Sequence, residues 1–226
     1  MLAYTTEVFF SVFALYNAAI WPAQLVATAL GVLVVLLTLR PRKGSDKIIA
    51  ACLAASWLWT GVVYHMMYFT TIEGAAWAFG AAFAIEGIGF AWTGVARGRL
   101  RFRFSPSLYG WAGLGLVIYS LAATPLIGSL AGHGWLRAPM FGVAPAPVTL
   151  FTLGMLLLSE RRVPHHLAVI PLLWCLIGGT AAWLLNVAED LALPLAGVAA
   201  MALVLWKNRR AFATPKRLRP RRPGGA

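Results

Sequence analysis

The residues that could do chemistry in this chain are few, and the two most unusual ones lie inside apolar runs. Glu86 is the acid within the run WAFGAAFAIEGIGF, and His65 is the histidine within GVVYHMMYF. An ionisable side chain at membrane depth is costly and is a functional candidate by default. Glu86 and His65 are therefore the leading site candidates.

Glu86 lies about 12 residues from the expected outer end of its helix, so ~18 Å deep at 1.5 Å per residue. Near the bilayer midplane its carboxyl should face the helix bundle or water. Small residues on one side of it favour the close approach of another helix; they are Ala75, Ala78, Ala82, Gly89 and Thr93. Two interpretations stay open: Glu86 titrates a proton or binds a cation, or it is a neutral carboxyl that hydrogen-bonds to a neighbouring helix.

His65 has aromatic neighbours, and it lies ~9 Å above Glu86 along the membrane normal by the same helical rise. The two side chains should not touch, so a relay between them would need Tyr64, Tyr68 or water. His65 is then either a packed, hydrogen-bonded residue or a proton carrier, metal ligand or haem ligand.

Further polar residues are expected on the outer side. Asn17 and Gln24 flank Pro22, and a helix broken at this point could turn its polar groups toward a vestibule. Residues of the outer loops could converge over the same vestibule: Glu73, His133, Arg137, Glu189 and Asp190. The alternative is that outer loops simply carry polar residues.

Enzyme and cofactor signatures are absent from the sequence. It contains no HExxH, no GxSxG and no pair of carboxylates within one run. The last apolar run holds no lysine for a retinal Schiff base. A metal or haem site would have to use His65 and the loop residue His133, with Met66 and Met67 nearby; otherwise no cofactor is expected.

The composition indicates the elements that must carry these residues. The chain has 226 residues, of which 60% are hydrophobic and 12% charged, and its mean hydropathy is +0.76. Soluble domains carry about 25% charged residues. Apolar runs near the ~20 residues that span a bilayer recur throughout. We therefore expect an all-α integral membrane bundle, one domain over 1–206, followed by a basic tail over 207–226 that is partly disordered.

Seven transmembrane helices are predicted, at 21–39, 48–70, 75–96, 108–127, 144–159, 165–185 and 191–206. Residues 7–18 are read as a short interfacial helix before Pro22, and one long helix kinked at Pro22 is the alternative. Cys52 and Cys175 fall inside apolar runs, where free thiols usually pack.

The distribution of basic residues sets the expected orientation. Of the 19 Lys and Arg residues, the segments 40–47, 97–103, 160–163 and 207–226 hold all but Arg137. Alternate loops rich in Lys and Arg are cytoplasmic, so the N-terminus is expected outside and the C-terminus in the cytoplasm. The net charge of +12 then serves contact with anionic lipid headgroups, and no nucleic acid partner is expected.

Four motifs occur together in a familiar order and spacing: LYNAAIWPAQ (15–24), GVVYHMMYFTTIEGAAWAFG (61–80), MFGVAPAPVTLFTLGMLLL (140–158) and VIPLLWCLIGGTAAWLL (169–185). Their combination resembles an uncharacterised family of bacterial polytopic inner-membrane proteins with a domain-of-unknown-function label. The resemblance implies a multi-pass protein of the inner membrane and supplies no activity. That family often has a neutral amide at the position of Glu73 and can have cysteine at that of Ala146, so it does not imply a shared acid or thiol at either.

Three functional hypotheses follow. The first is transport or binding of a small solute or ion, with Glu86 as the proton or cation site and His65 beside the access path. The second is a membrane subunit or scaffold that does not transport, whose partner is another membrane protein or a second copy of the chain. The third is a metal- or haem-binding redox component that uses His65.

Overall fold

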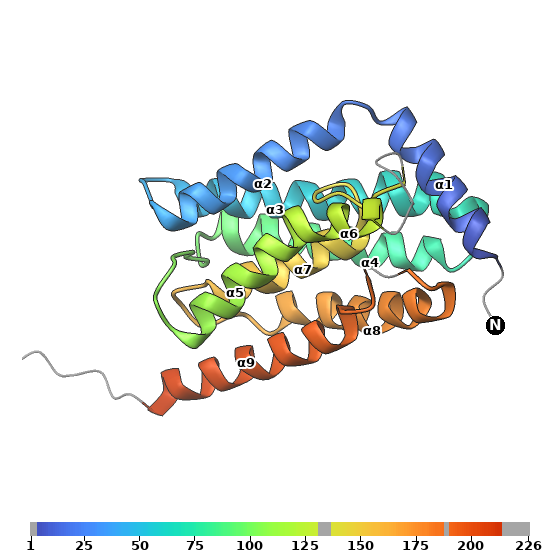
Figure 1. Cartoon of the computed structure of the whole chain (residues 1–226). Coiled ribbons are helices and arrows are strands. Elements are labelled where there is room, and N and C mark those ends of the chain that lie inside the picture. The colour runs from blue at the N-terminus through green and yellow to red at the C-terminus, as the bar shows by residue number, and fades with distance from the viewer. Residues whose placement is uncertain (1–3, 131–136, 188–189, 214–226) are drawn as a thin grey trace, which may run out of the picture.

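The structure is a computed structural model that describes residues 4–130, 137–187 and 190–213. These residues form helices and no strands, with one isolated bridge between Phe102 and Ser159, and they confirm the all-α fold class. The helices, drawn in Figure 1, are α1 (Thr6–Ala19), α2 (Ala23–Leu39), α3 (Ser45–Trp59), η1 (Thr60–Tyr68), η2 (Phe69–Thr71), α4 (Ala76–Phe90), η3 (Ala91–Ala96), α5 (Leu108–Ile118), η4 (Tyr119–Ala123), α6 (Thr124–Leu130), α7 (Pro145–Leu157), α8 (His166–Leu185) and α9 (Leu193–Ala213).

Four helices in the described part of the chain are apolar and long enough to cross a membrane. They are α3 with its continuation to Thr71, α4 with η3, α5 through α6, and α8; the predicted boundaries of these spans differ from them by at most three residues. The pair α1 and α2 would add a fifth if counted as one span. The 13 residues of α7 reach only about 20 Å. The chain therefore has the architecture of a membrane protein with several spans.

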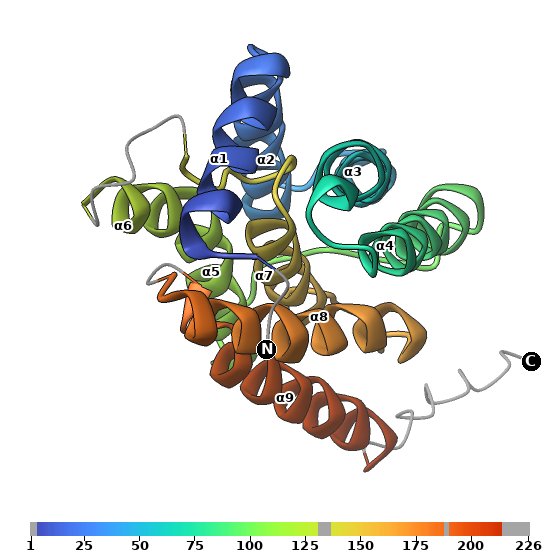
Figure 2. The same ribbon diagram turned by 90° about the vertical axis from the view of Figure 1, so that its right-hand side faces the viewer.

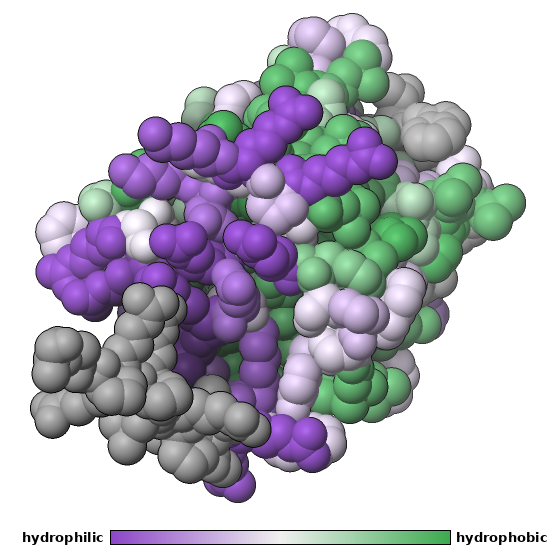
Figure 3. All heavy atoms as spheres, turned by 90° about the vertical axis from the view of Figure 1, so that its left-hand side faces the viewer, coloured by the Kyte–Doolittle hydropathy of each residue, from purple (hydrophilic) through white to green (hydrophobic). Residues whose placement is uncertain are grey.

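The basic loops gather at one end of the bundle, which we call the basic end (Figures 1 and 3). Hydrogen bonds join them: the Phe102 N–H donates to Asp46 Oδ1 at 2.9 Å, and the Val163 N–H donates to Asn208 Oδ1 at 3.0 Å. The turn that holds Glu73 lies at the opposite end, which we call the acidic end. The predicted alternation of the loops between two ends agrees with this arrangement.

Pro22 separates α1 from α2, and the two helices meet at 85°. Proline has no N–H to continue the helix and disfavours helical backbone at the preceding residue, Trp21. The predicted separate helix over 7–18 is thus present as α1. Because of the bend, α1 does not run parallel to the other helices. It crosses the acidic end, between the start of α2 and α8 (Figure 2).

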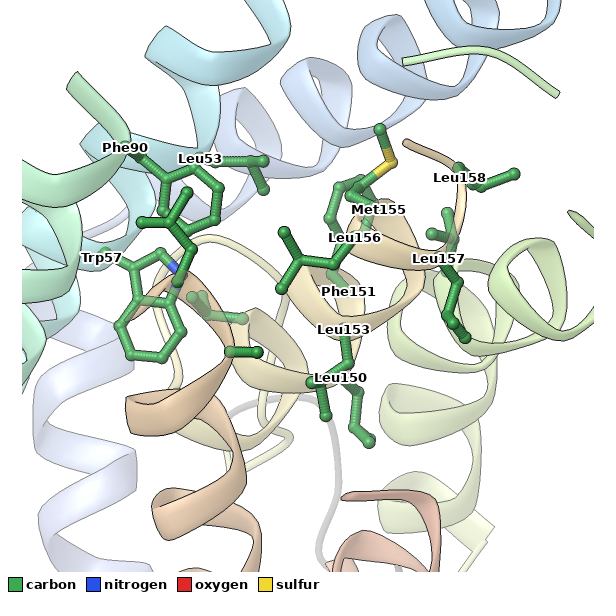
Figure 4. Packing of buried hydrophobic residues seen from close by; sticks show 14 of the residues in the cluster. Leu53, Trp57, Phe90, Leu150, Phe151, Leu153, Met155, Leu156, Leu157 and Leu158 are labelled. Carbon is green, nitrogen blue, oxygen red and sulfur yellow. The ribbon is translucent and has the colours of Figure 1, made fainter. Parts of the chain in front are cut away.

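α7 forms the centre of the bundle, and all 13 of its residues are buried. Its sequence PAPVTLFTLGMLL is apolar on every face, as expected for a helix without a solvent or lipid side. α5, α8 and α9 surround it (Figure 2). Its leucines form one hydrophobic core with Trp57 and Phe90 (Figure 4), and the Trp57 Nε1–H donates to Thr152 Oγ1 at 2.8 Å.

α3 and α4 touch through glycines. A Cβ added to Gly61 would lie 2.8 Å from the Gly80 carbonyl oxygen, and one added to Gly87 would lie 3.0 Å from the Ala54 carbonyl oxygen. The predicted contact through the small residues beside Glu86 is partly wrong, because Ala75 and Ala78 are exposed. Gly80 and Gly87 allow the close approach because they, and not Ala75 and Ala78, face α3 and its continuation η1.

Three spans change from α-helical to π-helical register along their length, at η1, η3 and η4. Pro125 gives a reason for η4, since it cannot donate to the carbonyl one turn earlier and its ring crowds that carbonyl. The π segment η4 precedes Pro125, and the helix continues beyond it to Leu130. π-helical segments are rare in proteins, and those that occur are often at functional sites. The segment η1 contains both Tyr64 and His65.

Candidate functional site

A partly open cavity of about 480 Å³ lies near the acidic end, between α1, η1, the start of α7 and α8. Most of its lining is apolar, and seven of the residues are aromatic: Tyr4, Phe9, Phe13, Tyr64, Phe69, Phe79 and Trp174. Glu73 and Asp190 also line it, and its described lining includes no Lys, Arg or His. The predicted convergence of outer acids is therefore observed for these two residues.

α1 carries the aromatic side chains that cover the cavity. Phe9 and Phe13 are four residues apart and so lie on one face of the helix; the Phe13 ring lies 5.0 Å from that of Tyr64. Tyr16 fixes the helix, because its hydroxyl donates to the Val143 carbonyl at 2.7 Å and accepts from Trp59 Nε1 at 2.9 Å.

Asn17 and Gln24 are buried at the bend between α1 and α2 and do not line the cavity. Gln24 Nε2 donates to the Asn17 carbonyl at 2.6 Å, and Asn17 Nδ2 donates to the Ala138 carbonyl at 3.2 Å. Asn17 thus ties the bend to the segment that precedes α7, and Gln24 ties α2 to α1 across the bend. In this arrangement they position α1 over the cavity, and a direct binding role for them stays a prediction.

His65 is fully buried behind the cavity wall. Its ring lies 4.7 Å from that of Phe83 and 5.0 Å from that of Trp174. Neither ring nitrogen has a hydrogen-bond partner among the described residues. Tyr64 lies at 5.1 Å from the His65 ring, whereas the Tyr68 ring packs against Tyr16. Tyr64 is thus placed between His65 and the cavity.

Phe79, Phe83, Trp174 and His65 form what we call the aromatic layer. It joins η1, α4 and α8. Two of its members, Phe79 and Trp174, line the cavity, and nearer the basic end the Thr93 hydroxyl of η3 lies 3.3 Å from His166 Nε2 of α8. The aromatic layer is therefore the floor of the cavity.

Glu86 lies beyond this floor. It is only 2% exposed, its Oε1 has no hydrogen-bond partner among the described residues, and it does not line the cavity. It follows Phe79 by seven residues on α4, which is about 10 Å further from the acidic end. The structure thus arranges the cavity, the aromatic layer and the buried carboxyl in succession along α4.

The charge around the cavity is negative. Burial and the neighbouring negative charge of Glu73 raise the pKa of Tyr4 to about 12, so this hydroxyl stays neutral at physiological pH. Pro145 and Ala146, at the start of α7, also line the cavity. Helix N-termini attract anions through free N–H groups, but Pro145 has none, and the Val148 N–H is used by the Ala144 carbonyl at 3.2 Å.

The metal hypothesis rests on His65 and His133, and of these the structure describes only His65. His133 and Glu189 lie outside the described residues. Within 4–130, 137–187 and 190–213, no group of three or more His, Cys, Asp and Glu side chains could hold a metal ion. Met67 points outward and is 62% exposed. His65 is the described histidine nearest the cavity, and its surroundings are aromatic.

Sequence reasoning missed most of the cavity wall. The signal that could have indicated it is the aromatic spacing in FFSVFALY, where Phe9, Phe13 and Tyr16 recur on one helical face. No comparable signal pointed to Trp174 or Phe79, which join the wall only through the packing of α8 against α4.

The chain belongs to a family of unknown function, DUF6064, whose model matches residues 6–214. This confirms the expectation, drawn from four motifs, of an uncharacterised family. No curated protein and no solved structure matches the chain.

Proposed function

We propose that this member of a family of unknown function binds a small solute in the cavity at its acidic end and transports it, or an ion coupled to it, across the bacterial inner membrane. Glu86 is the proton or cation site, and His65 lies beside the path between the cavity and Glu86. The observation that carries the proposal is the succession of cavity, aromatic layer and buried carboxyl along α4.

The size and wall of the cavity support a binding role. Ligand pockets have volumes of about 300–1,000 Å³ and are lined mostly by apolar and aromatic side chains with a few polar groups. A cavity of about 480 Å³ with aromatic walls and two carboxylates fits this description. The unpaired Oε1 of Glu86 supports a functional role as well, since a carboxyl that served only as packing would be expected to hydrogen-bond to a neighbouring helix.

The proposal includes seven spans, with the N-terminus outside and the C-terminus in the cytoplasm. The gathering of the basic loops at one end (Figure 3) supports it, because cytoplasmic loops carry the excess of Lys and Arg. In this orientation the cavity opens to the outside. The basic end then contacts the anionic headgroups of the inner leaflet.

The test is proton flux into liposomes that contain the purified protein. Glu86→Gln keeps the size of the side chain and removes its titration, so we expect it to reduce flux at least about tenfold if the carboxyl carries the proton. Glu160→Gln is the matched control, because Glu160 is an exposed acid at the basic end and should leave flux unchanged. Wild type and Glu86→Gln that are equally silent with every ion tested would contradict transport and favour the scaffold hypothesis.

A further inference from the structure

We infer that the ligand of the cavity is an organic cation with an apolar body, such as a hydrophobic amine or quaternary ammonium compound. The inference rests on the proposed binding function and adds the chemical class of the ligand. It combines three independent properties of the same cavity: the sign of its charge, the nature of its wall and the small number of N–H donors at the start of α7.

The charge of the cavity opposes that of the whole chain. The protein has a net charge of +12 and only 7 acidic residues, yet the charged residues among the described lining are the acids Glu73 and Asp190. They come from two different turns, before α4 and before α9. Acids that line a low-dielectric cleft concentrate cations there, so a positively charged solute is favoured over an anion.

The wall supplies the second property. A cation over the face of an aromatic ring is attracted by about 0.5–2 kcal/mol, and tryptophan is the strongest partner. Tyr64, Phe13 and Trp174 present such rings from η1, α1 and α8. The same rings bury apolar surface, so a ligand with an ammonium group and an apolar body uses both kinds of contact.

The third property disfavours an anion. The start of α7 reaches the cavity and would ordinarily be an anion site. Pro145 and Pro147 remove two of the N–H groups of its first turn, and the Val148 N–H is already bonded to the Ala144 carbonyl. The helix end thus meets the cavity with few donors, and the described lining adds no basic side chain to replace them.

The test uses two probes of the same shape and opposite charge on the purified full-length protein in detergent. Tetraphenylphosphonium should bind saturably, and tetraphenylborate should not. Binding of tetraphenylphosphonium should weaken by about fivefold or more between ~0.01 M and ~1 M salt, because the Debye length falls from about 30 Å to 3 Å. Salt-insensitive binding of the cation, or tighter binding of the anion, would overturn the inference.

Variants locate the site. The double change Glu73→Gln and Asp190→Asn should weaken tetraphenylphosphonium binding by about fivefold to tenfold, and Trp174→Leu by about threefold or more through loss of the ring face. Glu160→Gln, at the basic end, is the control and should bind as wild type. Unchanged affinity in both the double variant and Trp174→Leu would refute the site.

A neutral probe tests the binding function of the cavity separately from the charge of its ligand. N-phenyl-1-naphthylamine should bind wild type and the double carboxyl variant alike, which also verifies that the variant is folded. Saturable binding of the neutral probe without binding of the cation would refute the ligand class and leave the binding function standing. A protein that binds none of the three probes would refute both.

Discussion

His65 is the described residue that packing alone explains least. Its ring is fully buried among aromatic side chains, and neither nitrogen has a hydrogen-bond partner among the described residues. An unsatisfied buried polar group costs about 1–3 kcal/mol, and a phenylalanine would fill the same space without that cost. The position of His65 between the cavity and Glu86 therefore favours a role in function over a role in stability.

Replacement of His65 by phenylalanine should separate these two roles. We expect His65→Phe to raise the free energy of unfolding by about 1 kcal/mol, because it removes unpaired polar atoms, and to reduce proton flux. His65→Ala should lower the free energy of unfolding by about 2–4 kcal/mol, because the smaller side chain leaves a cavity. Thermal unfolding in detergent measures both changes, and a His65→Phe protein that is less stable but fully active would contradict this assignment.

The sequence allowed part of the site to be predicted. The burial of Glu86 and His65 follows from their positions within apolar runs, because such runs form the helices of the bundle. The cavity could not be predicted in this way. Trp174 and Phe79 are nearly a hundred residues apart, and only the packing of α8 against α4 brings them together.

At the scale of the elements, α7 depends on how closely its neighbours can approach. α5 crosses α7 where Gly113 meets Gly154: a Cβ on Gly113 would lie 2.7 Å from the Gly154 carbonyl oxygen, and a Cβ on Gly154 would lie 2.6 Å from the Gly113 carbonyl oxygen. Backbone atoms at such distances cannot move aside as a flexible side chain can. Glycine at both positions is therefore required by the crossing.

Two alanine substitutions on α5 test this crossing, one at the contact with α7 and one away from it as a control. Gly113→Ala should lower the free energy of unfolding by about 1–3 kcal/mol, because it forces α5 away from α7. Gly115→Ala is the control: a Cβ there meets nothing within 4 Å, and we expect a gain of about 0.5–1 kcal/mol from the higher helix propensity of alanine. Thermal unfolding of both variants gives the comparison, and equal effects at the two positions would refute the close crossing.

The elements themselves were predictable to a different degree. The apolar runs predicted four of the seven expected spans to within three residues, and Pro22 predicted the boundary between α1 and α2, because both signals are local. The π-helical register of η1 was not predictable: TGVVYHMMY carries no proline or other local signal for it. The hydrogen bonds of Tyr16 and Asn17 that hold α1 across the acidic end were also missed, since their partners Val143 and Ala138 lie in a distant segment.

At the scale of the whole molecule, charge is divided between the two ends of the bundle. The basic end collects loops that hydrogen-bond to one another, as between Asp46 and Phe102, and Figure 3 shows the hydrophilic side chains gathered there. The acidic end carries the cavity with Glu73 and Asp190. In the orientation proposed above, the positive-inside rule puts the basic end in the cytoplasm, and the cavity faces the outside of the cell.

Cysteine labelling in intact cells tests this orientation directly. The native Cys52 and Cys175 are buried, so a membrane-impermeant maleimide should react only with an introduced cysteine. Gly74→Cys lies in the turn at the acidic end, where a Cβ meets nothing within 4 Å, and we expect it to be labelled from outside. Lys43→Cys lies in an exposed basic loop and should be labelled only after the membrane is opened, because Lys and Arg hold their loops in the cytoplasm. The reverse pattern would place the cavity toward the cytoplasm and contradict the proposed orientation.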